Sequence, residues 1–342
     1  MRIVVAMSGG VDSSVAAALL REEGHEVIGV HMKLHDNHGG EGHCCGLDDA
    51  WDARRVADRL GIPFYVLDLQ EAFAEAVVNP YVDAWKAGLT PNPCVTCNGV
   101  LKFRVLLRRA ALLGAEKLAT GHYARTHDGR LFMAADPAKD QSYFLHPVPS
   151  TALQKTLFPL GEFTKREVRE HARRLGLVTA EKAESMEVCF VPGDDHAAFV
   201  SRHAPDLEAA GEIVDEAGQV LGQHEGYHRY TLGQRRGLGL AGGPWFVIAV
   251  DPGARRVVVG PEHRLLRHEV FARGVNLIRP PGTGELHARL RHRGALVPCE
   301  ILSLDPLQLR LLAPARAITP GQSVVVYEGD ELCLGGVIAR AA

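Results

Sequence analysis

The chain has 342 residues, 46% of them hydrophobic, and a formal net charge of −3 at pH 7. This length predicts two or three domains, and the charge excludes a global attraction to nucleic acid, so any RNA surface must be a local basic patch. No apolar run is long enough to span a membrane, and the first predicted strand begins at residue 2, which leaves no room for a signal peptide. We therefore expect a cytoplasmic protein whose seven cysteines are reduced, metal-binding or catalytic.

The first fourteen residues predict a phosphate-binding loop. Residues 2–7 form a short apolar run typical of a buried parallel strand; Ser-Gly-Gly-Val-Asp-Ser follows at residues 8–13, and apolar residues then recur at helical spacing. A strand, a glycine-rich turn and a helix direct backbone N–H groups and the positive helix end at a phosphate. The loop has no Gly-Lys-Ser/Thr ending, so it is not a Walker A loop. Asp12 is a candidate to hold Mg²⁺ or to cap the helix.

Strand and helix patterns alternate through the N-terminal half. Strands are expected at residues 26–32, 64–69 and 116–120, and helices at residues 48–60 and 165–175. Short links between successive strand–helix units predict an α/β fold with a doubly wound parallel sheet. The last of these helices carries Lys165, Arg169 and Arg173 in one stripe, which suits phosphate contact and a solvated face equally well.

Two segments of this half are rich in potential ligands. The first is the loop at residues 33–46, which contains His35, His38, His43, Cys44 and Cys45. Its spacing fits no standard zinc pattern, so we favour a solvated loop over a metal site. The second is Thr120-Gly121-His122, which follows a predicted strand at the edge where open α/β sheets bind ligands.

A Cys-x-x-Cys motif, Cys94 and Cys97, lies in a proline-rich segment. A helix is expected to begin near Asn98, and the dipole of a helix lowers the pKa of a thiol just before its N-terminus. Cys97 is therefore a candidate nucleophile, although the motif alone does not separate nucleophilic, redox and metal-binding roles. Cys189, in a short apolar segment, is either a second reactive thiol or a buried structural cysteine. The basic residues of the predicted helix suit a functional role and a solvated face equally well; they are Lys102, Arg104, Arg108 and Arg109.

Beyond about residue 205 the pattern changes to short strands with Gly/Pro turns. Strands are expected at residues 212–214, 220–222, 245–250, 257–259, 286–290, 299–302, 307–312 and 324–327. Because Pro280-Pro281-Gly282 is interpreted as a linker, we predict an α/β domain over residues 1–204, a central β-rich domain over 205–275 and a last β domain over 276–342. Arg289, Arg291 and Arg293 alternate, which predicts one basic strand face.

Several motifs together carry a family resemblance that runs nearly end to end. They are Ser-Gly-Gly-Val-Asp-Ser at 8–13, Pro-Asn-Pro at 91–93, Cys97-Asn98, Lys102-Phe103, Ala-Thr-Gly-His-Tyr-Ala at 119–124, Lys-Asp-Gln-Ser-Tyr at 139–143, Glu-Val-Cys-Phe at 187–190 and Tyr-Thr-Leu-Gly-Gln-Arg-Arg-Gly at 230–237. In this order and spacing the chain resembles the bacterial tRNA 2-thiouridylases, which are PP-loop ATP pyrophosphatases. The resemblance implies a PP-loop domain, a small C-terminal β-barrel, and an enzyme that places sulfur on carbon 2 of the wobble uridine of tRNA while ATP is cleaved to AMP and pyrophosphate.

The resemblance also implies roles for individual residues. ATP, with Mg²⁺, would be held by Ala6, Met7, Ser8, Gly9, Gly10, Val11, Asp12, Ser13, Met32 and Gly121. ATP would adenylate the C2 oxygen of uracil, Cys189 would carry sulfur as a persulfide, and Cys97 would assist its release or close a disulfide with Cys189. The flipped base would be bordered by Asn92, Pro93 and Cys94, and the rest of the tRNA would be contacted by Lys139, Asp140, Gln141, Arg291 and His292. The sulfur would come from a sulfur-relay protein, a cysteine desulfurase or free sulfide.

Cys94 departs from the family pattern, because many members have Asp at this position; many also have Tyr where His292 stands. The role of that Asp does not transfer to a thiol. Cys94, Cys97 and Cys189 are three soft ligands, so one mechanism is a four-iron four-sulfur cluster whose open iron takes sulfide and delivers it to the activated uridine. In the competing mechanism Cys189 carries a persulfide, Cys97 is its partner and Cys94 is a bystander.

Two other classes of function are alternatives. A different PP-loop enzyme would adenylate a small molecule and would need neither Cys97 nor Cys189. A non-catalytic protein that uses ATP as a ligand would bind tRNA equally well with both cysteines replaced.

Overall fold

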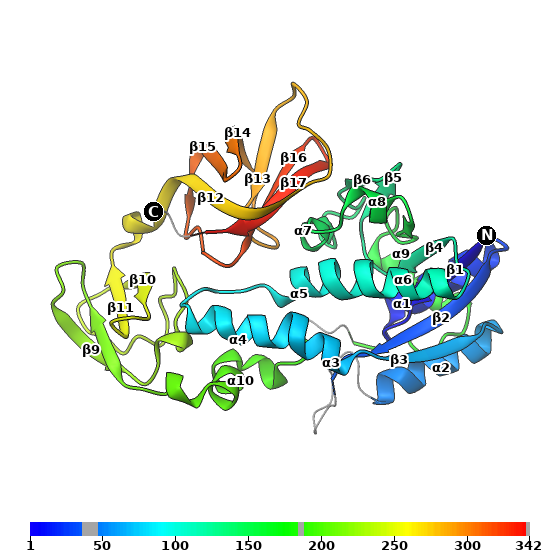
Figure 1. The fold of residues 1–342 in the computed structure, drawn as a ribbon, viewed down its shortest axis with the longest axis horizontal. Helices are drawn as coiled ribbons and strands as arrows, with labels where there is room; N and C mark the ends of the chain where they lie inside the picture. Colours follow the sequence, from blue (N-terminus) through cyan, green and yellow to red (C-terminus); the bar gives the residue numbers. More distant parts are fainter. Residues whose placement is uncertain (36–46, 184–187, 340–342) are drawn as a thin grey trace.

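The N-terminal domain is built on a five-stranded parallel sheet, seen in a computed structural model that describes residues 1–35, 47–183 and 188–339 (Figure 1). The strand order is β3-β2-β1-β4-β7, with bounds Phe64–Asp68, Glu26–Lys33, Arg2–Ala6, Lys117–Thr120 and Thr156–Leu157. All pairings within it are parallel. The predicted doubly wound sheet is confirmed, and its order reverses between β1 and β4, where such sheets bind ligands.

The two faces of this sheet belong to two apolar cores, because alternate residues of a strand face opposite sides. Ile3 and Val5 of β1 lie in one core, together with α1 (Val11–Glu22), α2 (Leu47–Leu60) and α9 (Lys165–Arg174). Val4 lies in the other core, together with the helices between residues 70 and 112. All three side chains are fully buried, which explains why the β1 sequence is an unbroken apolar run.

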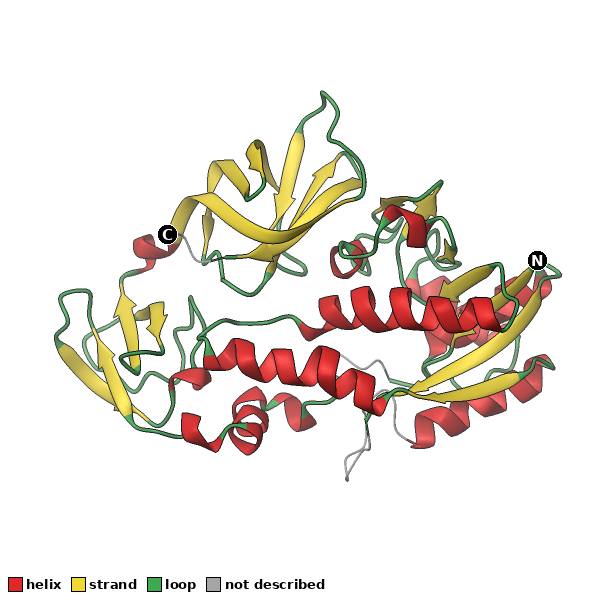
Figure 2. Ribbon diagram, viewed as in Figure 1, coloured by secondary structure: helices red, strands yellow, loops and turns green. Residues whose placement is uncertain are grey.

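Two long helical segments pack in the second core and extend past the sheet (Figure 2). The first runs through α3 (Gln70–Phe73), η1 (Ala74–Val78) and α4 (Asn79–Lys86); the second runs through α5 (Pro93–Thr96), η2 (Cys97–Leu106) and α6 (Leu107–Leu112). Both η1 and η2 are π-helical, a rare conformation that is frequent at functional sites. The helix predicted to begin near Asn98 begins at Pro93, a residue suited to the first helical turn.

The central domain is a small four-stranded sheet of order β10-β11-β8-β9. Its strands are β8 (Gly211–Val214), β9 (Val220–His224), β10 (Phe246–Asp251) and β11 (Arg256–Gly260), which agree with the predicted positions. The preceding helices are η3 (Pro192–Asp194), α10 (His196–His203) and η4 (Pro205–Leu207), and η5 (Tyr227–Arg229) follows β9. Ile213 and Val247 belong to the same apolar core as α4, so this domain packs on the ends of the helical segments. Within the described ranges, no helix is long and apolar enough to cross a membrane.

A closed antiparallel barrel of six strands follows η6 (Glu262–Leu265) (Figure 1). The order is β12-β15-β14-β13-β16-β17, and β12 pairs with β17 to close the barrel. The bounds are β12 Leu266–Leu277, β13 Leu286–Arg289, β14 Val297–Leu304, β15 Leu307–Arg316, β16 Ser323–Glu328 and β17 Glu331–Ile338. Val324, Val326 and Leu334 fill its interior.

The barrel corrects three details of the sequence prediction. It begins at Leu266, before the predicted domain boundary at residue 276. Residues 280–282 are not a linker between domains, because they lie in the connection between β12 and β13 of the barrel. Arg289 ends β13, whereas Arg291 and Arg293 lie in the turn that follows, so the three do not share one strand face.

A hairpin of the N-terminal domain extends the barrel sheet. It consists of β5 (Arg125–His127) and β6 (Arg130–Phe132), and β6 pairs with β17 of the barrel. The helices α7 (Ser142–Leu145) and α8 (Ser150–Leu153) follow it in the chain. The ion pairs that fasten the two domains are Arg125–Asp330, Arg130–Glu331 and Arg289–Asp140. The position of the barrel is therefore fixed relative to the parallel sheet.

Candidate active site

A cavity of about 320 Å³ lies at the carboxyl ends of β1, β2 and β4, against the second helical segment. From the sheet it is lined by Ala6, Met7, Ser8, Asp12, Ser13, Met32, Leu34, Thr120, Gly121 and His122. From the helices and later loops it is lined by Phe73, Val77, Pro93, Cys94, Cys97, Lys102, Gln141, Val188, Cys189 and Phe190. The cavity therefore brings together most of the predicted nucleotide-binding residues and all three candidate thiols.

The loop at residues 8–13 has the geometry of a phosphate cradle. Gly9 has φ of +80°, and a Cβ there would lie 2.2 Å from the Asp49 carbonyl oxygen, so the turn requires glycine. Gly10 precedes α1, and no described side chain caps that helix end. A Cβ on Gly121 would lie 2.6 Å from the Ser13 nitrogen, so the loop after β4 closes directly over the start of α1. The uncapped backbone N–H groups and the helix dipole fit the phosphates of ATP.

Asp12 is held by two donors and does not cap α1. Its carboxylate accepts hydrogen bonds from the Tyr123 hydroxyl at 2.7 Å and from the Lys165 ammonium at 2.7 and 2.8 Å. The capping alternative is therefore wrong, whereas the carboxylate stays in the cavity lining. The bond from Tyr123 also joins the phosphate loop to the segment that follows β4.

The basic stripe of α9 has structural partners. Arg169 donates to the carbonyl oxygens of Ala180 and Lys182, and Arg173 pairs with Glu181 at 2.7 Å. Of the two interpretations left open for this stripe, phosphate contact and a solvated face, these partners favour a structural face for Arg169 and Arg173. Among its members, only Lys165 reaches the phosphate loop, through Asp12.

Met32 lies at the end of β2 and lines the cavity near a buried histidine. The His31 ring shares a hydrogen bond of 2.9 Å with the Met7 carbonyl, and burial lowers its pKa. His31 is therefore a neutral side chain that ties the end of β2 to the end of β1. This contact fixes Met32 beside the phosphate loop, as an adenine-binding position requires.

The three thiols differ in their surroundings. Cys94 is exposed in the first turn of α5, Cys97 is buried, and Cys189 is half-buried. Cys97 lies inside the helical segment, because the helix begins at Pro93, and burial raises the pKa of its thiol while Lys102 opposes that rise. The prediction that a helix N-terminus lowers the pKa of Cys97 is therefore wrong; Cys94 occupies the position that the dipole favours.

The residues do not fit a metal cluster. Among the described residues, no group of three or more His, Cys, Asp or Glu side chains is arranged to hold a metal ion. The arrangement of Cys94, Cys97 and Cys189 thus gives the iron–sulfur expectation no support. His38, His43, Cys44 and Cys45, considered above as ligands, lie outside the described residues.

Asp140, predicted to contact tRNA, is an internal residue. It is 4% exposed, and its carboxylate accepts from the backbone N–H groups of Ala134 and Ser142 and pairs with Arg289 at 2.5 Å. A direct contact of this carboxylate with RNA is therefore contradicted by burial. Its neighbour Gln141 lines the cavity and accepts a hydrogen bond from the Tyr123 backbone at 3.0 Å.

The remaining predicted RNA contacts lie at the surface or near the cavity. Lys139 and Asn92 are half-buried, and Pro93 lines the cavity. Arg291 is exposed in the turn after β13. His292 is half-buried with its ring centroid 4.3 Å from that of Phe144, and burial lowers its pKa. His292 thus holds the turn in place by packing on Phe144, and the positive charge of Arg291 is exposed to solvent.

Two cavity residues were missed or undervalued in the sequence. His122 is half-buried, its Nδ1 lies 2.7 Å from the Thr120 hydroxyl, and desolvation of its ring holds its pKa well below the usual range. The sequence feature that pointed to His122 was its position directly after the strand β4. Lys102, for which the sequence left a functional role and a solvated face open, lines the cavity. Its spacing from Cys97 gave no signal, because five residues do not return to the same face of an α-helix.

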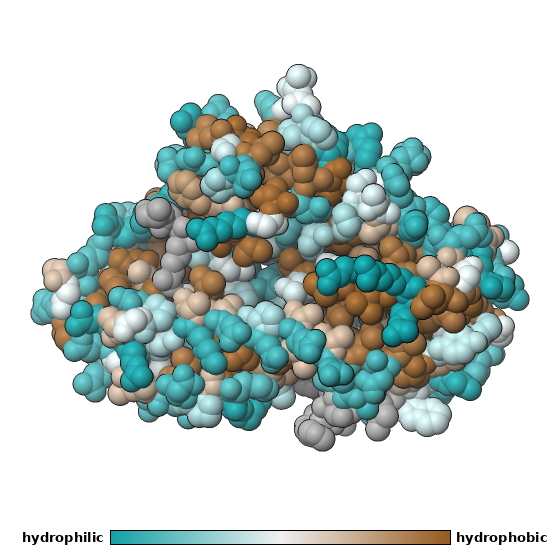
Figure 3. Space-filling model, viewed as in Figure 1, coloured by the Kyte–Doolittle hydropathy of each residue, from teal (hydrophilic) through white to brown (hydrophobic). Residues whose placement is uncertain are grey.

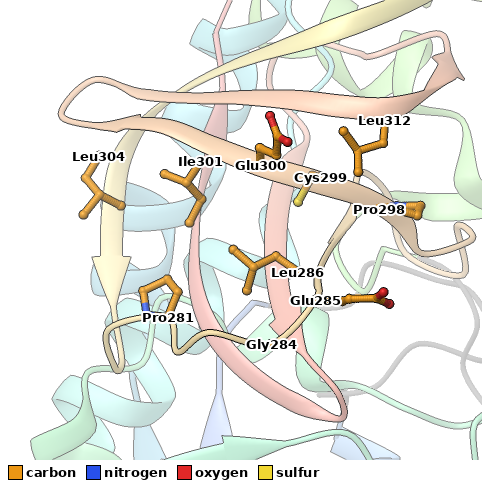
Figure 4. Close-up of a pocket in the computed structure, with 10 residues that line it drawn as sticks. All are labelled: Pro281, Gly284, Glu285, Leu286, Pro298, Cys299, Glu300, Ile301, Leu304 and Leu312. Carbon is orange, nitrogen blue, oxygen red and sulfur yellow. The ribbon is translucent and has the colours of Figure 1, made fainter.

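A second hollow, of about 570 Å³, lies on the barrel between β14 and the β12–β13 connection (Figure 4). Apolar residues gather over the barrel on the face drawn in Figure 3. Leu304 and Leu312, which line the hollow, are exposed. The charged residues of the hollow are Glu285 and Glu300. With carboxylates and no cation among its described lining, this hollow does not suit a nucleotide.

The glycine-rich loop, the parallel sheet and the cavity at its switch point define an ATP-using enzyme of the PP-loop class. Three family profiles match in succession: "tRNA methyl transferase HUP domain" at residues 1–193, "tRNA methyl transferase PRC-barrel domain" at 197–261 and "Aminomethyltransferase beta-barrel domain" at 267–338. The chain belongs to the tRNA 2-thiouridylase family.

The relatives that support this assignment match almost the whole chain. It is 50% identical to the tRNA-specific 2-thiouridylase MnmA of Geobacter metallireducens, over 99% of this chain and 97% of the relative. It is 48% identical to the protein of that name from Geotalea uraniireducens, over 99% and 95%, and 46% identical to the one from Magnetococcus marinus, over 98% of each chain.

Proposed function

We propose that this chain is a cytoplasmic tRNA 2-thiouridylase that uses ATP to replace the C2 oxygen of the wobble uridine with sulfur. One observation carries the proposal: a single cavity joins the phosphate loop to Cys94, Cys97 and Cys189. A nucleotide-activating group and sulfur nucleophiles within one cavity are what oxygen-to-sulfur exchange needs. The cavity lies in the domain that ends at about residue 204. The barrel, which begins at about residue 265, is the proposed RNA-binding surface.

The first step activates the base. The uridine C2 oxygen attacks the α-phosphorus of ATP, a P–O bond to uridine forms, and the bond to the β-phosphate breaks with release of pyrophosphate. The backbone of the phosphate loop and the start of α1 hold the phosphates, and Met32 and Gly121 border the nucleoside. Asp12 is the residue that would hold Mg²⁺, which neutralises charge on the phosphates.

The second step transfers sulfur. The terminal sulfur of a Cys189 persulfide attacks carbon 2, and the Cys97 thiolate attacks the Cys189 sulfur to form a disulfide. The electron pair of the broken S–S bond stays on the transferred sulfur, the C2–O bond breaks, and AMP leaves. Cys189 is reloaded in one of two balanced ways: an external thiol reduces the disulfide and a persulfide-bearing protein then transfers its outer sulfur to the Cys189 thiolate, or sulfide attacks the Cys189 sulfur of the disulfide, which forms the persulfide and releases the Cys97 thiolate. We prefer this relay to the cluster because no step in it needs a metal ligand set.

The tRNA binds across the cavity mouth and the barrel. The target base is extruded, because carbon 2 is inaccessible in a stack, and Asn92, Pro93 and Cys94 border it. Lys139, Gln141 and Arg291 contact the backbone. Asp140 and His292 position these groups from inside, through the pair with Arg289 and the packing on Phe144.

Incubation with ATP, a sulfane-sulfur donor and unmodified tRNA tests the proposal. We expect 2-thiouridine in the digested tRNA by mass spectrometry, with AMP and pyrophosphate formed in step with it. ADP as the sole nucleotide product would contradict PP-loop chemistry. Undiminished thiolation by the Cys97→Ser and Cys189→Ser variants would contradict the relay, and tRNA binding without thiolation would favour the non-catalytic alternative.

A further inference from the structure

Lys102 enters the cavity from the same helical segment as Cys97. Both side chains line the cavity, and both belong to η2 (Cys97–Leu106). In an α-helix a separation of five residues turns the chain by about 500°, which leaves two side chains roughly 140° apart. A lysine at that spacing would point away from a cavity-facing cysteine.

The π-helical geometry of η2 removes this mismatch. A π-helix bonds each residue to the fifth residue along, so a side chain five positions later lies about one turn on and over the same face. Cys97 is the first residue of η2 and Lys102 lies five positions further. The rare backbone conformation therefore has a consequence in the site: it places an ammonium group beside a thiol.

No other described side chain neutralises the charge of Lys102. Lys102 is the only lysine or arginine among the described residues that line the cavity, and within the described ranges it forms no ion pair. Its charge lowers the pKa of Cys97, against the rise caused by burial, and it also lowers the pKa of His122. Desolvation lowers the pKa of the half-buried His122 ring well below its usual range, so His122 supplies no competing positive charge.

We propose that Lys102 is a positioning residue that stabilises the Cys97 thiolate against the cost of burial when Cys97 attacks the Cys189 sulfur. The role rests on the proposed function. The other titratable groups that line the cavity are Asp12 on α1, Cys94 on α5, His122 after β4, and Cys189. Asp12 already binds Lys165 and Tyr123, and His122 is a neutral donor or acceptor, so Lys102 is the group that supplies positive charge to Cys97.

The test measures alkylation of Cys97 by iodoacetamide against pH, with the label localised by tandem mass spectrometry. In Lys102→Met we expect the pH midpoint of Cys97 alkylation to rise by about one unit, which slows the reaction at neutral pH by about tenfold. Lys102→Arg keeps the charge and should restore most of the rate. Lys155→Met removes an exposed lysine outside the cavity and should match the unmodified chain.

Two outcomes would overturn the proposal. One is a pH profile of Lys102→Met that overlays that of the unmodified chain. The other is a rate lowered equally at every pH, which a change in access or folding gives and a missing charge does not. The alkylation assay needs neither ATP nor tRNA, so it is independent of the thiolation assay. If the unmodified chain failed to thiolate tRNA, that would count against the proposed function, and the effect of Lys102 on Cys97 would still be measured.

Discussion

The cavity and the barrel both hold buried cysteines, and their surroundings separate them. Cys97 is 8% exposed, and Cys299 and Cys333 of the barrel are 4% and 0% exposed. Burial raises the pKa of Cys299 to about 12 and that of Cys333 to about 11. Burial alone therefore does not distinguish Cys97 from the barrel cysteines; what distinguishes it is that it lines the cavity beside the phosphate loop, together with a lysine that has no ion pair among the described residues.

The cations next to the two sets of thiols show the same contrast. Arg279 lies near Cys333 and lowers the pKa of that thiol, but it pairs with Glu328 and Glu331. Lys102 has no such partner among the described residues. Among the described residues, the cation that lines the cavity has no ion pair, whereas Arg279 of the barrel is committed to ion pairs that hold the fold.

The largest expected effect separates the two sets of thiols by activity. Cys97→Ser and Cys189→Ser should each lower the rate of tRNA thiolation by about 10³-fold or more, since each removes a nucleophile of the relay. Cys299→Ala and Cys333→Ala should keep it within about threefold, because neither thiol reaches the cavity. Single-turnover assays with radiolabelled sulfur measure both. An inactive Cys299→Ala protein that folds normally would contradict the assignment of the reactive thiols to the cavity.

The next effect concerns the ion pair that docks the barrel. Asp140 and Arg289 are buried, with side chains 2% and 13% exposed, so Asp140→Asn should cost about 3–5 kcal/mol of unfolding free energy by leaving a charge unpaired. The matched control is Glu300→Gln, which breaks the exposed pair with Arg310 within the barrel and should cost at most about 1 kcal/mol. Urea unfolding measures both variants, and equal losses would contradict a fixed barrel.

A third effect is a pH dependence at the same interface. His146 is 2% exposed, its Nε2 lies 2.9 Å from the Ser323 hydroxyl of the barrel, and burial lowers its pKa from 6.5 to about 4. Between these values the unfolded chain binds a proton that the folded chain does not. Folding stability should therefore fall by about 3 kcal/mol as pH drops from about 6.5 to about 4, and fall no further through this group below that.

Urea midpoints at a series of pH values test this dependence. His146→Gln should lower the steepness of the stability profile in that window by about one proton. His127→Gln is the control, because His127 is 79% exposed in its side chain and should change nothing. A His146→Gln profile as steep as that of the unmodified chain would show that another group titrates.

The smallest effect concerns the exposed turn of the barrel. Arg291→Ala and Arg293→Ala should each weaken tRNA binding a few-fold and reduce the salt slope of log K by about one for each phosphate that the turn no longer neutralises. Arg310→Ala, at an exposed pair elsewhere on the barrel, should leave the slope unchanged. Binding isotherms at several salt concentrations decide this. An unchanged slope in both turn variants would remove the turn from the RNA surface.

The parts of the molecule that sequence predicted are those specified locally. The phosphate loop is a contiguous motif, and β1 is a contiguous apolar run, so neither needs knowledge of distant residues. The parts that were wrong depend on contacts far apart in sequence. Asp140 lies in a polar stretch of sequence, yet it is buried where it forms an ion pair with Arg289 of the barrel. The barrel itself is closed by the pairing of β12 with β17.

The candidate site shows the same difference between features specified locally and features that depend on distant contacts. Cys94, Cys97 and Cys189 were identified by residue type and motif, but the pKa of Cys97 depends on burial, which its motif does not encode. Lys102 was left between a functional role and a solvated face, because α-helical periodicity gave no reason to place it on the same face as Cys97. A π-helix inside an α-helix has no reliable sequence signal, so its effect on which residues face the cavity appears only in the structure.

The most direct test of the thiol relay is to locate the sulfur before it reaches tRNA. The protein is loaded with a sulfane-sulfur donor, quenched in acid and mapped by tandem mass spectrometry; ATP and tRNA are then added and both sulfur pools are followed in a single turnover. The relay predicts one extra sulfur on Cys189, which leaves at the rate at which 2-thiouridine forms, with a Cys97–Cys189 disulfide appearing in step. Full-rate thiolation by Cys189→Ser, or extra sulfur confined to Cys299 and Cys333, would contradict it.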